Sequence, residues 1–179
     1  METLLERNIT TGVKDANGKI HFYGDQNVTR GQVAAFLYRA AGSPNFDLDE
    51  LDSNFSDSKG HQFARAIAWL KAEGYAKGID NKFYPDSIVK REELAKLIVN
   101  VLNLKVLVTG TTGAVMNFGD VKELVTDSEV SAAILVLKKL GIVSGLDDKF
   151  YPATSITRGQ TAKIIAEAIT TTSEPTVAK

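Results

Sequence analysis

The sequence lacks cysteine altogether and has only four prolines and one tryptophan among 179 residues. The absence of cysteine excludes disulfide bonds and metal sites built from thiolates. No apolar run approaches the roughly 18 residues of a membrane-spanning helix, so we expect no membrane insertion. The net charge is −1, which argues against a broad basic surface for nucleic acid. The apolar content of 44% is normal for a globular domain.

Sequence motifs for common catalytic and metal chemistry are also missing. His21 and His61 stand alone, so a zinc site is not expected. The acidic stretch at residues 47–52 lacks the glycine and distal glutamate of an EF-hand. There is no Ser-His-Asp pattern, phosphate loop or dinucleotide fingerprint, and no carboxylate pair is singled out for glycoside hydrolysis. We therefore expect no enzyme activity, no catalytic residues, no cofactor and no metal.

What the sequence does contain is a short pattern that recurs at residues 28–32, 89–93 and 156–160. A helical apolar run follows each copy, and Thr-x-x-Gln in the first and third predicts a capping box. Each copy places an arginine at the first helical position, where the helix dipole disfavours a cation. Three such arginines indicate a shared counter-anion. Two interpretations stay open: an anion-binding corner made with free helix amides, or pairing of each arginine with an acidic residue of its own fold.

The repeat extends well beyond these five residues. Residues 74–85 match residues 141–152 without a gap, at an offset of 67 that also relates Gly78 to Gly145. The first copy is looser, and Asn17-Gly18 predicts that its insertion lengthens a hairpin. Each full copy predicts a helix, a short extended piece, a turn and a second helix.

The ordered set of Phe-x-Asp, amphipathic helix, Gly-x-x-x-Gly, Phe-x-Pro and Ile-Thr-Arg resembles the S-layer homology (SLH) family. The resemblance implies a mostly α fold of three tandem helix–short extended piece–helix repeats in a pseudo-threefold assembly. The expected boundaries are 1–42 for a first repeat with a shortened first helix, 52–104 for the second, 117–170 for the third and 171–179 for a Thr-rich linker.

The resemblance also implies a function, which composition and periodicity do not. It predicts a non-covalent anchor at the Gram-positive cell surface that binds an anionic, often pyruvylated, secondary cell-wall polysaccharide in grooves between repeats. Two alternatives stay open: a surface assembly module that associates with itself or another surface protein without binding sugar, and the binding part of a wall-degrading enzyme. The start of the sequence, residues 1–5, lacks the features of a signal peptide, so an extracellular role predicts a longer parent chain.

The family motifs fall on specific residues of this chain. The groove arginines are Arg30, Arg91 and Arg158, and the Phe-x-Asp carboxylates are Asp57 and Asp120, with none in the first copy. The polar position before the second glycine is Thr11, Lys77 and Ser144. Tyr23, Tyr84 and Tyr151 are the open stacking candidates, whereas Phe22, Phe83 and Phe150 are expected to fill the core and Trp69 to be buried or partly buried. The shortened first repeat predicts an incomplete groove, with one or two sites weak or silent.

Overall fold

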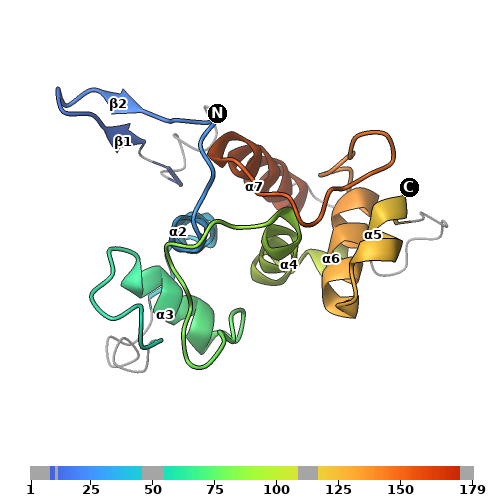
Figure 1. The fold of residues 1–179 in the computed structure, drawn as a ribbon, viewed down its shortest axis with the longest axis horizontal. Helices are drawn as coiled ribbons and strands as arrows, with labels where there is room; N and C mark the ends of the chain where they lie inside the picture. The colour runs from blue at the N-terminus through green and yellow to red at the C-terminus, as the bar shows by residue number, and fades with distance from the viewer. Residues whose placement is uncertain (1–8, 11, 46–54, 109–116, 174–179) are drawn as a thin grey trace. The chain divides into compact units, whose positions relative to one another are not determined.

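The computed structural model describes residues 9–10, 12–45, 55–108 and 117–173 (Figure 1). These residues form mainly helices, which confirms the predicted mostly α fold class, while the pseudo-threefold arrangement stays a prediction. The chain divides into two compact units. Unit 1 comprises Met1–Val89 with Ser155–Ala162, and unit 2 comprises Lys90–Thr154 with Lys163–Lys179.

Unit 1 contains a short hairpin and two packed helices (Figure 1). Strands β1 (Val13–Lys14) and β2 (Ile20–His21) pair antiparallel, with Val13 opposite His21. The turn between them includes Gly18 at φ 79°, which confirms the predicted Asn-Gly hairpin. Helix α2 (Arg30–Ala40) packs against α3 (Ala64–Ala72), and Trp69 is buried as expected.

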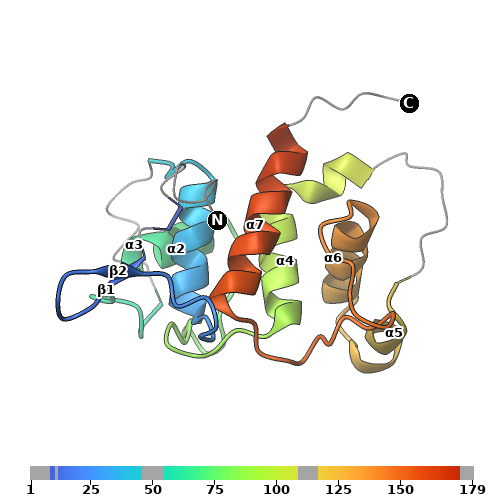
Figure 2. The ribbon, with the colours of Figure 1, turned by 90° about the horizontal axis from the view of Figure 1, so that it is seen from above.

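Unit 2 is built on α4 (Arg91–Val101), which packs against α6 (Ser128–Lys139) (Figure 2). The 3₁₀ helix η2 (Leu104–Val108) contacts both helices, and the short α5 (Gly119–Leu124) precedes α6. Lys96 of α4 forms ion pairs of 3.0 Å with Asp127 and 2.9 Å with Glu129. These ion pairs fix the start of α6 beside α4.

Helix α7 (Arg158–Ser173) begins in unit 1 and continues into unit 2. It runs three residues into the stretch predicted as a linker. The side chains of Thr171 and Ser173 donate to the carbonyls of Glu167 and Ile169, at 2.8 Å each. These bonds give the hydroxyls partners within the helix, so the Thr-rich composition is compatible with a last helical turn. Residues 174–179 lie outside the described residues.

Glycine at position 78 is required by both the backbone and the available space. Gly78 has φ 67°, and a Cβ there would collide with the ring of Phe55 and would lie 2.6 Å from the Lys82 carbonyl oxygen. Gly145 has the same surroundings, formed by Phe118 and Lys149. In each copy the glycine allows the tight turn that leads into the next phenylalanine.

The three equivalent apolar residues before the arginine helices are joined by backbone hydrogen bonds. Val28 N–H donates to Ile156, Val89 N–H donates to Val28, and Ile156 N–H donates to Val89, each at 3.1 Å. All three residues belong to unit 1 and are buried. The three bonds therefore form a closed cycle that connects the three predicted copies.

Candidate functional site

Separate candidate sites lie at the starts of α2, α4 and α7, where the repeated pattern occurs. Thr29 Oγ1 accepts from the Gln32 amide at 3.3 Å, and Gln32 Oε1 accepts from the Thr29 amide at 3.2 Å. Thr157 and Gln160 form the same pair at the start of α7. Both predicted capping boxes are confirmed, and they place each arginine at the first helical position.

The helix amides beside the arginines already have partners. Arg30 N–H donates to the Ser87 carbonyl at 2.9 Å, and Gly31 N–H donates to Pro85 at 2.8 Å. The equivalent donors at the other two helix starts are Arg91 and Glu92, bonded to Thr154 and Pro152, and Arg158 and Gly159, bonded to Gln26 and Gly24. The prediction that free amides would receive an anion was therefore wrong, because carbonyl groups of a distant turn accept hydrogen bonds from these amides at each helix start. An anion at these corners must be bound by side chains.

The three guanidinium groups share one geometry. The Nε–H groups of Arg30, Arg91 and Arg158 donate to the carbonyls of Phe83, Phe150 and Phe22, at 2.8, 2.8 and 2.9 Å. Each guanidinium carbon also lies over the ring of the same phenylalanine, 4.8, 4.7 and 5.2 Å from its centroid. A hydrogen bond and a cation–π contact together fix the plane of each guanidinium. We call each such pair an arginine corner.

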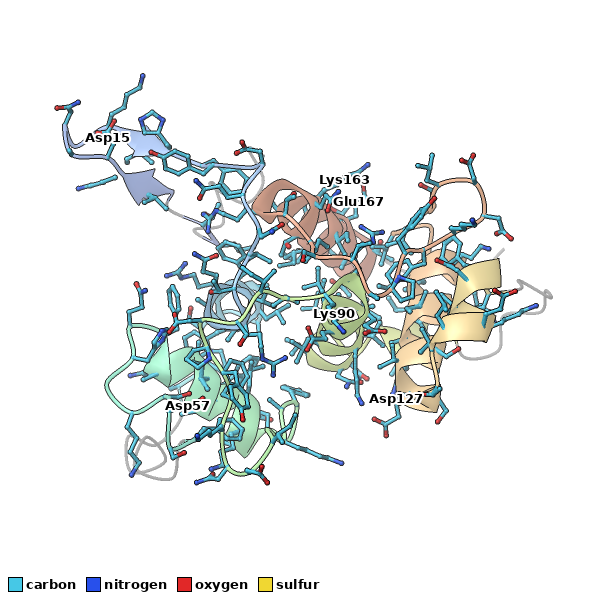
Figure 3. All side chains as sticks on the ribbon, viewed as in Figure 1. Asp15, Asp57, Lys90, Asp127, Lys163 and Glu167 are labelled. Carbon is cyan, nitrogen blue, oxygen red and sulfur yellow. The ribbon has the colours of Figure 1, made fainter. Side chains whose placement is uncertain are left out.

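The two Phe-x-Asp carboxylates organise the turn beside an arginine corner. Asp57, labelled in Figure 3, accepts from the amides of Phe83 at 2.9 Å and Tyr84 at 2.7 Å, one on each oxygen. Asp120 accepts from Phe150 and Tyr151 at the same two distances. Among the described residues, neither carboxylate forms an ion pair with an arginine, so the proposed Arg–Asp bridge is not seen there.

The pKa of Asp57 reflects two opposing causes. Burial raises it, but the hydrogen bonds from the Phe83 and Tyr84 amides and the Ser58 hydroxyl bring it below its ordinary value. Asp57 is therefore held as a carboxylate that positions backbone, and its lone pairs are already largely used.

The two tyrosines of these turns point away from the core. Tyr84 and Tyr151 have φ of 59° and 58°, a strained region for a non-glycine residue. Their exposed fractions are 42% and 40%, whereas Phe83 and Phe150 are buried, as the sequence predicted for all four residues. An open depression of about 390 Å³ lies beside Tyr84, lined by Asp57, Tyr84, Pro85, Asp86 and Ser87.

The corner at Arg158 differs from the other two. Arg158 is only 5% exposed, and its guanidinium carbon lies 5.2 and 5.4 Å from the ring centroids of Phe22 and Phe36. The neighbouring Tyr23 stacks on His21 at 5.2 Å, and His21 pairs with Asp15 at 2.9 Å. No Phe-x-Asp carboxylate belongs to this turn.

Burial lowers the pKa of both Arg91 and Arg158 below the ordinary arginine value. At Arg91 the charge of Asp120 partly opposes that lowering, whereas burial alone acts on Arg158. The electrostatic surroundings of the two corners are therefore different.

The remaining predicted site residues are not drawn into these corners by any hydrogen bond or ion pair. Lys77 and Ser144 are exposed and make no such contact with another described residue. Thr11 lies outside the described residues. Their assignment as ligand-binding residues stays a prediction.

Sequence reasoning missed two lysines that support the arginine corners. Lys71 lies over the ring of Phe55 at 4.6 Å, and Phe55 stacks on Phe83 at 5.6 Å. Lys138 repeats this contact over Phe118 at 4.0 Å, and Phe118 stacks on Phe150 at 5.7 Å. In both copies, therefore, a lysine contacts one phenylalanine ring, that ring stacks on a second, and the second ring contacts the arginine of the corner. The signal was available, because the two lysines share the 67-residue offset of the repeat.

Within the described ranges, no group of three or more His, Asp or Glu side chains could hold a metal ion. No helix in the same part of the chain combines the length and apolar character needed to cross a membrane.

Comparison with known proteins gives one family. The model of the S-layer homology domain matches residues 54–95 and 117–162. These segments fall within the second and third predicted repeats and confirm the resemblance there. The first predicted repeat, 1–42, lies outside both segments, so the set of three repeats stays a prediction.

Three relatives extend this comparison. The chain is 31% identical to the S-layer protein sap of Bacillus anthracis over 159 residues, which is 89% of this chain and 19% of that protein. It is 32% identical to an S-layer protein of Bacillus thuringiensis subsp. finitimus over 165 residues, covering 92% of this chain and 19% of the relative. An uncharacterized cell wall amidase of Bacillus anthracis is 31% identical over 87 residues, covering 49% of this chain and 16% of the amidase.

The chain thus spans about a fifth of the length of these relatives. The domain match and the two S-layer relatives support a cell-surface anchoring module.

Proposed function

We propose that this chain, two segments of which match the S-layer homology domain, anchors a larger protein non-covalently to the cell wall by binding an anionic secondary cell-wall polysaccharide. The anionic groups of the polysaccharide would be carboxylates, such as that of ketal-linked pyruvate. The observation that carries the proposal is the arginine corner, repeated three times with the same hydrogen bond and the same ring contact. A guanidinium fixed in this way is ready to receive an anion without further ordering.

The chemistry of the corner suits a carboxylate. The Nε–H groups of Arg91 and Arg158 are used within the protein, so their terminal nitrogens would form the paired hydrogen bonds to the ligand. Tyr84 and Tyr151 would offer a ring face and a hydroxyl to the sugar beside the carboxylate. Lys77, Ser144 and Thr11 would add donors and acceptors at the rim.

Asp57 and Asp120 have a more indirect part in this proposal than the family resemblance implies. Each carboxylate already accepts two amide hydrogen bonds, so its main task is to hold Tyr84 or Tyr151 in place. Several weak sites would then engage one polymer chain together, which raises the effective affinity without any single strong contact.

The test is co-sedimentation with purified wall polymer, before and after chemical removal of its acidic substituents. We expect Arg91→Ala to weaken binding to the intact polymer about tenfold or more, since a hydrogen-bonded charge pair contributes about 1.5–3 kcal/mol. Lys122→Ala removes the same charge from the exposed face of α5 and should leave binding unchanged. Equal binding to intact and deacidified polymer, unaffected by Arg91→Ala, would overturn the proposal.

A surface assembly module without sugar binding is the second candidate, and one observation favours it. Val13, Ile79 and Leu146 follow the three equivalent glycines and are exposed by 44%, 67% and 65%. Each of these aliphatic side chains would be a separate contact point for self-association or for another surface protein. Light scattering distinguishes the two candidates, because a stable oligomer that does not bind the polymer is expected only for the assembly module.

A further inference from the structure

We infer that the corner at Arg158 is a stronger anion acceptor than the corner at Arg91, because Asp120 and the first-turn residues Glu92 and Glu93 have no acidic equivalents at Arg158. This inference rests on the proposed function and specifies which arginine corner binds the polysaccharide more strongly. It also reverses the expectation from the sequence, in which the shortened first repeat makes its groove weak.

The guanidinium of Arg158 is more rigidly held than that of Arg91. It contacts the rings of both Phe22 and Phe36, and its Nε–H donates to the Phe22 carbonyl at 2.9 Å. For Arg91, the structure gives one ring contact, with Phe150. A side chain that is already ordered loses less conformational entropy when a ligand binds.

The terminal nitrogens of Arg158 are nevertheless not fully enclosed. They donate no hydrogen bond to any other described residue. In the same part of the chain, Thr161 Oγ1 is the only fully enclosed side-chain nitrogen or oxygen without a partner. The terminal nitrogens of Arg158 must therefore reach solvent, although the residue as a whole is 5% exposed. A largely buried cation without a counter-charge is unfavourable, and a ligand carboxylate would supply that charge.

The acidic residues around the two corners differ. The first turn of α4 carries Glu92 and Glu93, and the charge of Asp120 acts on Arg91. The first turn of α7 has no acidic residue. Asp25 is exposed on the turn that meets α7, but it forms no ion pair with Arg158. Lys90 pairs with Glu92 at 3.9 Å, so an incoming carboxylate meets mainly the charges of Asp120 and Glu93 at the Arg91 corner, and weaker repulsion at Arg158.

Direct observation of the arginine side chains tests this ranking. Because each Nε–H is hydrogen-bonded to a carbonyl, its exchange with water should be slow enough for the three signals to be resolved by NMR. Arginine-to-lysine variants assign the signals one at a time. On titration with purified wall-polymer fragments, the Arg158 signal should reach half-saturation at a severalfold lower concentration than the Arg91 signal.

The outcomes separate this inference from the proposed function. If the Arg91 signal shifts first, or Arg158 does not respond while Arg91 does, the ranking is wrong and the anchor function stands. If no arginine signal responds and intact and deacidified fragments behave alike, the proposed function fails with it.

A charge substitution provides a second test that does not disturb the buried guanidinium. Gln160→Glu places at the start of α7 the carboxylate that Glu93 provides in α4, and it retains the capping box. Binding of the polymer should weaken about threefold at low salt, and the loss should shrink as salt is raised. Thermal stability should hold or rise, since an acidic side chain favours a helix start.

Asn103→Asp is the matched control, because it adds the same charge at an exposed position beyond the C-terminal end of α4, whereas Arg91 lies at the start of that helix. We expect it to leave polymer binding unchanged. Unchanged or tighter binding by Gln160→Glu would overturn the ranking.

Discussion

Asp57→Ala tests whether the Phe-x-Asp carboxylate holds the protein's own backbone or contacts the sugar directly. The substitution removes the acceptor for the Phe83 and Tyr84 amides, which lie 2.9 and 2.7 Å from its two oxygens. Phe83 is fully buried, so its amide would lose its partner in a place that water reaches poorly. Tyr84 is exposed, and its amide can turn to solvent instead.

The expected loss follows from these two bonds. A hydrogen bond to a charged group contributes about 1.5–3 kcal/mol, and an unpaired buried donor costs about 1–3 kcal/mol. Asp57 is only half-buried, so we take the lower part of this range for both bonds together. We expect the free energy of unfolding to fall by about 2–3 kcal/mol, which lowers Tm by about 4–12 °C for a protein of this size.

Urea unfolding followed by tryptophan fluorescence measures this loss where it occurs. Trp69 is the single tryptophan, is buried, and lies in unit 1 together with Asp57. Asp86→Ala is the control, since Asp86 is an exposed carboxylate on the same turn whose one described ion pair is a 3.3 Å contact with His61.

The pH dependence gives the same experiment a second readout. The folded state holds the pKa of Asp57 below the ordinary value of 3.8, so its contribution is fully present above pH 3.8 and is lost as the pH falls through the folded pKa. The stability difference between wild type and Asp57→Ala should therefore be constant from about pH 7 to 5 and should narrow below about pH 4. A difference under about 0.5 kcal/mol at pH 7, together with a large loss of polymer binding, would refute the positioning role.

Two further predictions concern the packing around the corners. Thr161→Val should raise stability by about 1–2 kcal/mol in a thermal melt, because it replaces an enclosed hydroxyl without a partner by the residue type of the equivalent Val33. Thr161→Ser is its control, and a loss of stability in the valine variant would mean that the hydroxyl is satisfied. Gly145→Ala should destabilise by more than about 2 kcal/mol, since the new Cβ would meet the Phe118 ring at a φ of 70°. Gly141 has the same φ of 70°, but a Cβ there would meet no atom within 4 Å, so Gly141→Ala should lower the free energy of unfolding by only about 1 kcal/mol. Equal losses in the two variants would contradict the steric argument.

The sequence alone determined the local features of this protein. It predicted where α2 and α7 begin, because a threonine followed three residues later by glutamine satisfies helix amides within one turn. It predicted the hairpin at Gly18 and the burial of Phe83 for similarly local reasons. The 67-residue offset then extended the burial of Phe83 to Phe150, and the two segments that match the S-layer homology domain lie in those two copies.

Only the tertiary structure decided how the arginine corners are completed. The carbonyl that fixes Arg158 belongs to Phe22, 136 residues earlier in the chain, and no local pattern specifies such a partner. Distant segments also supply the turn carbonyls that accept from the first helix amides and the Phe83 amide that donates to Asp57. Helix caps and apolar periodicity depend on neighbours within a few residues, whereas the accessibility and charge of a binding corner depend on which distant segments fold against it.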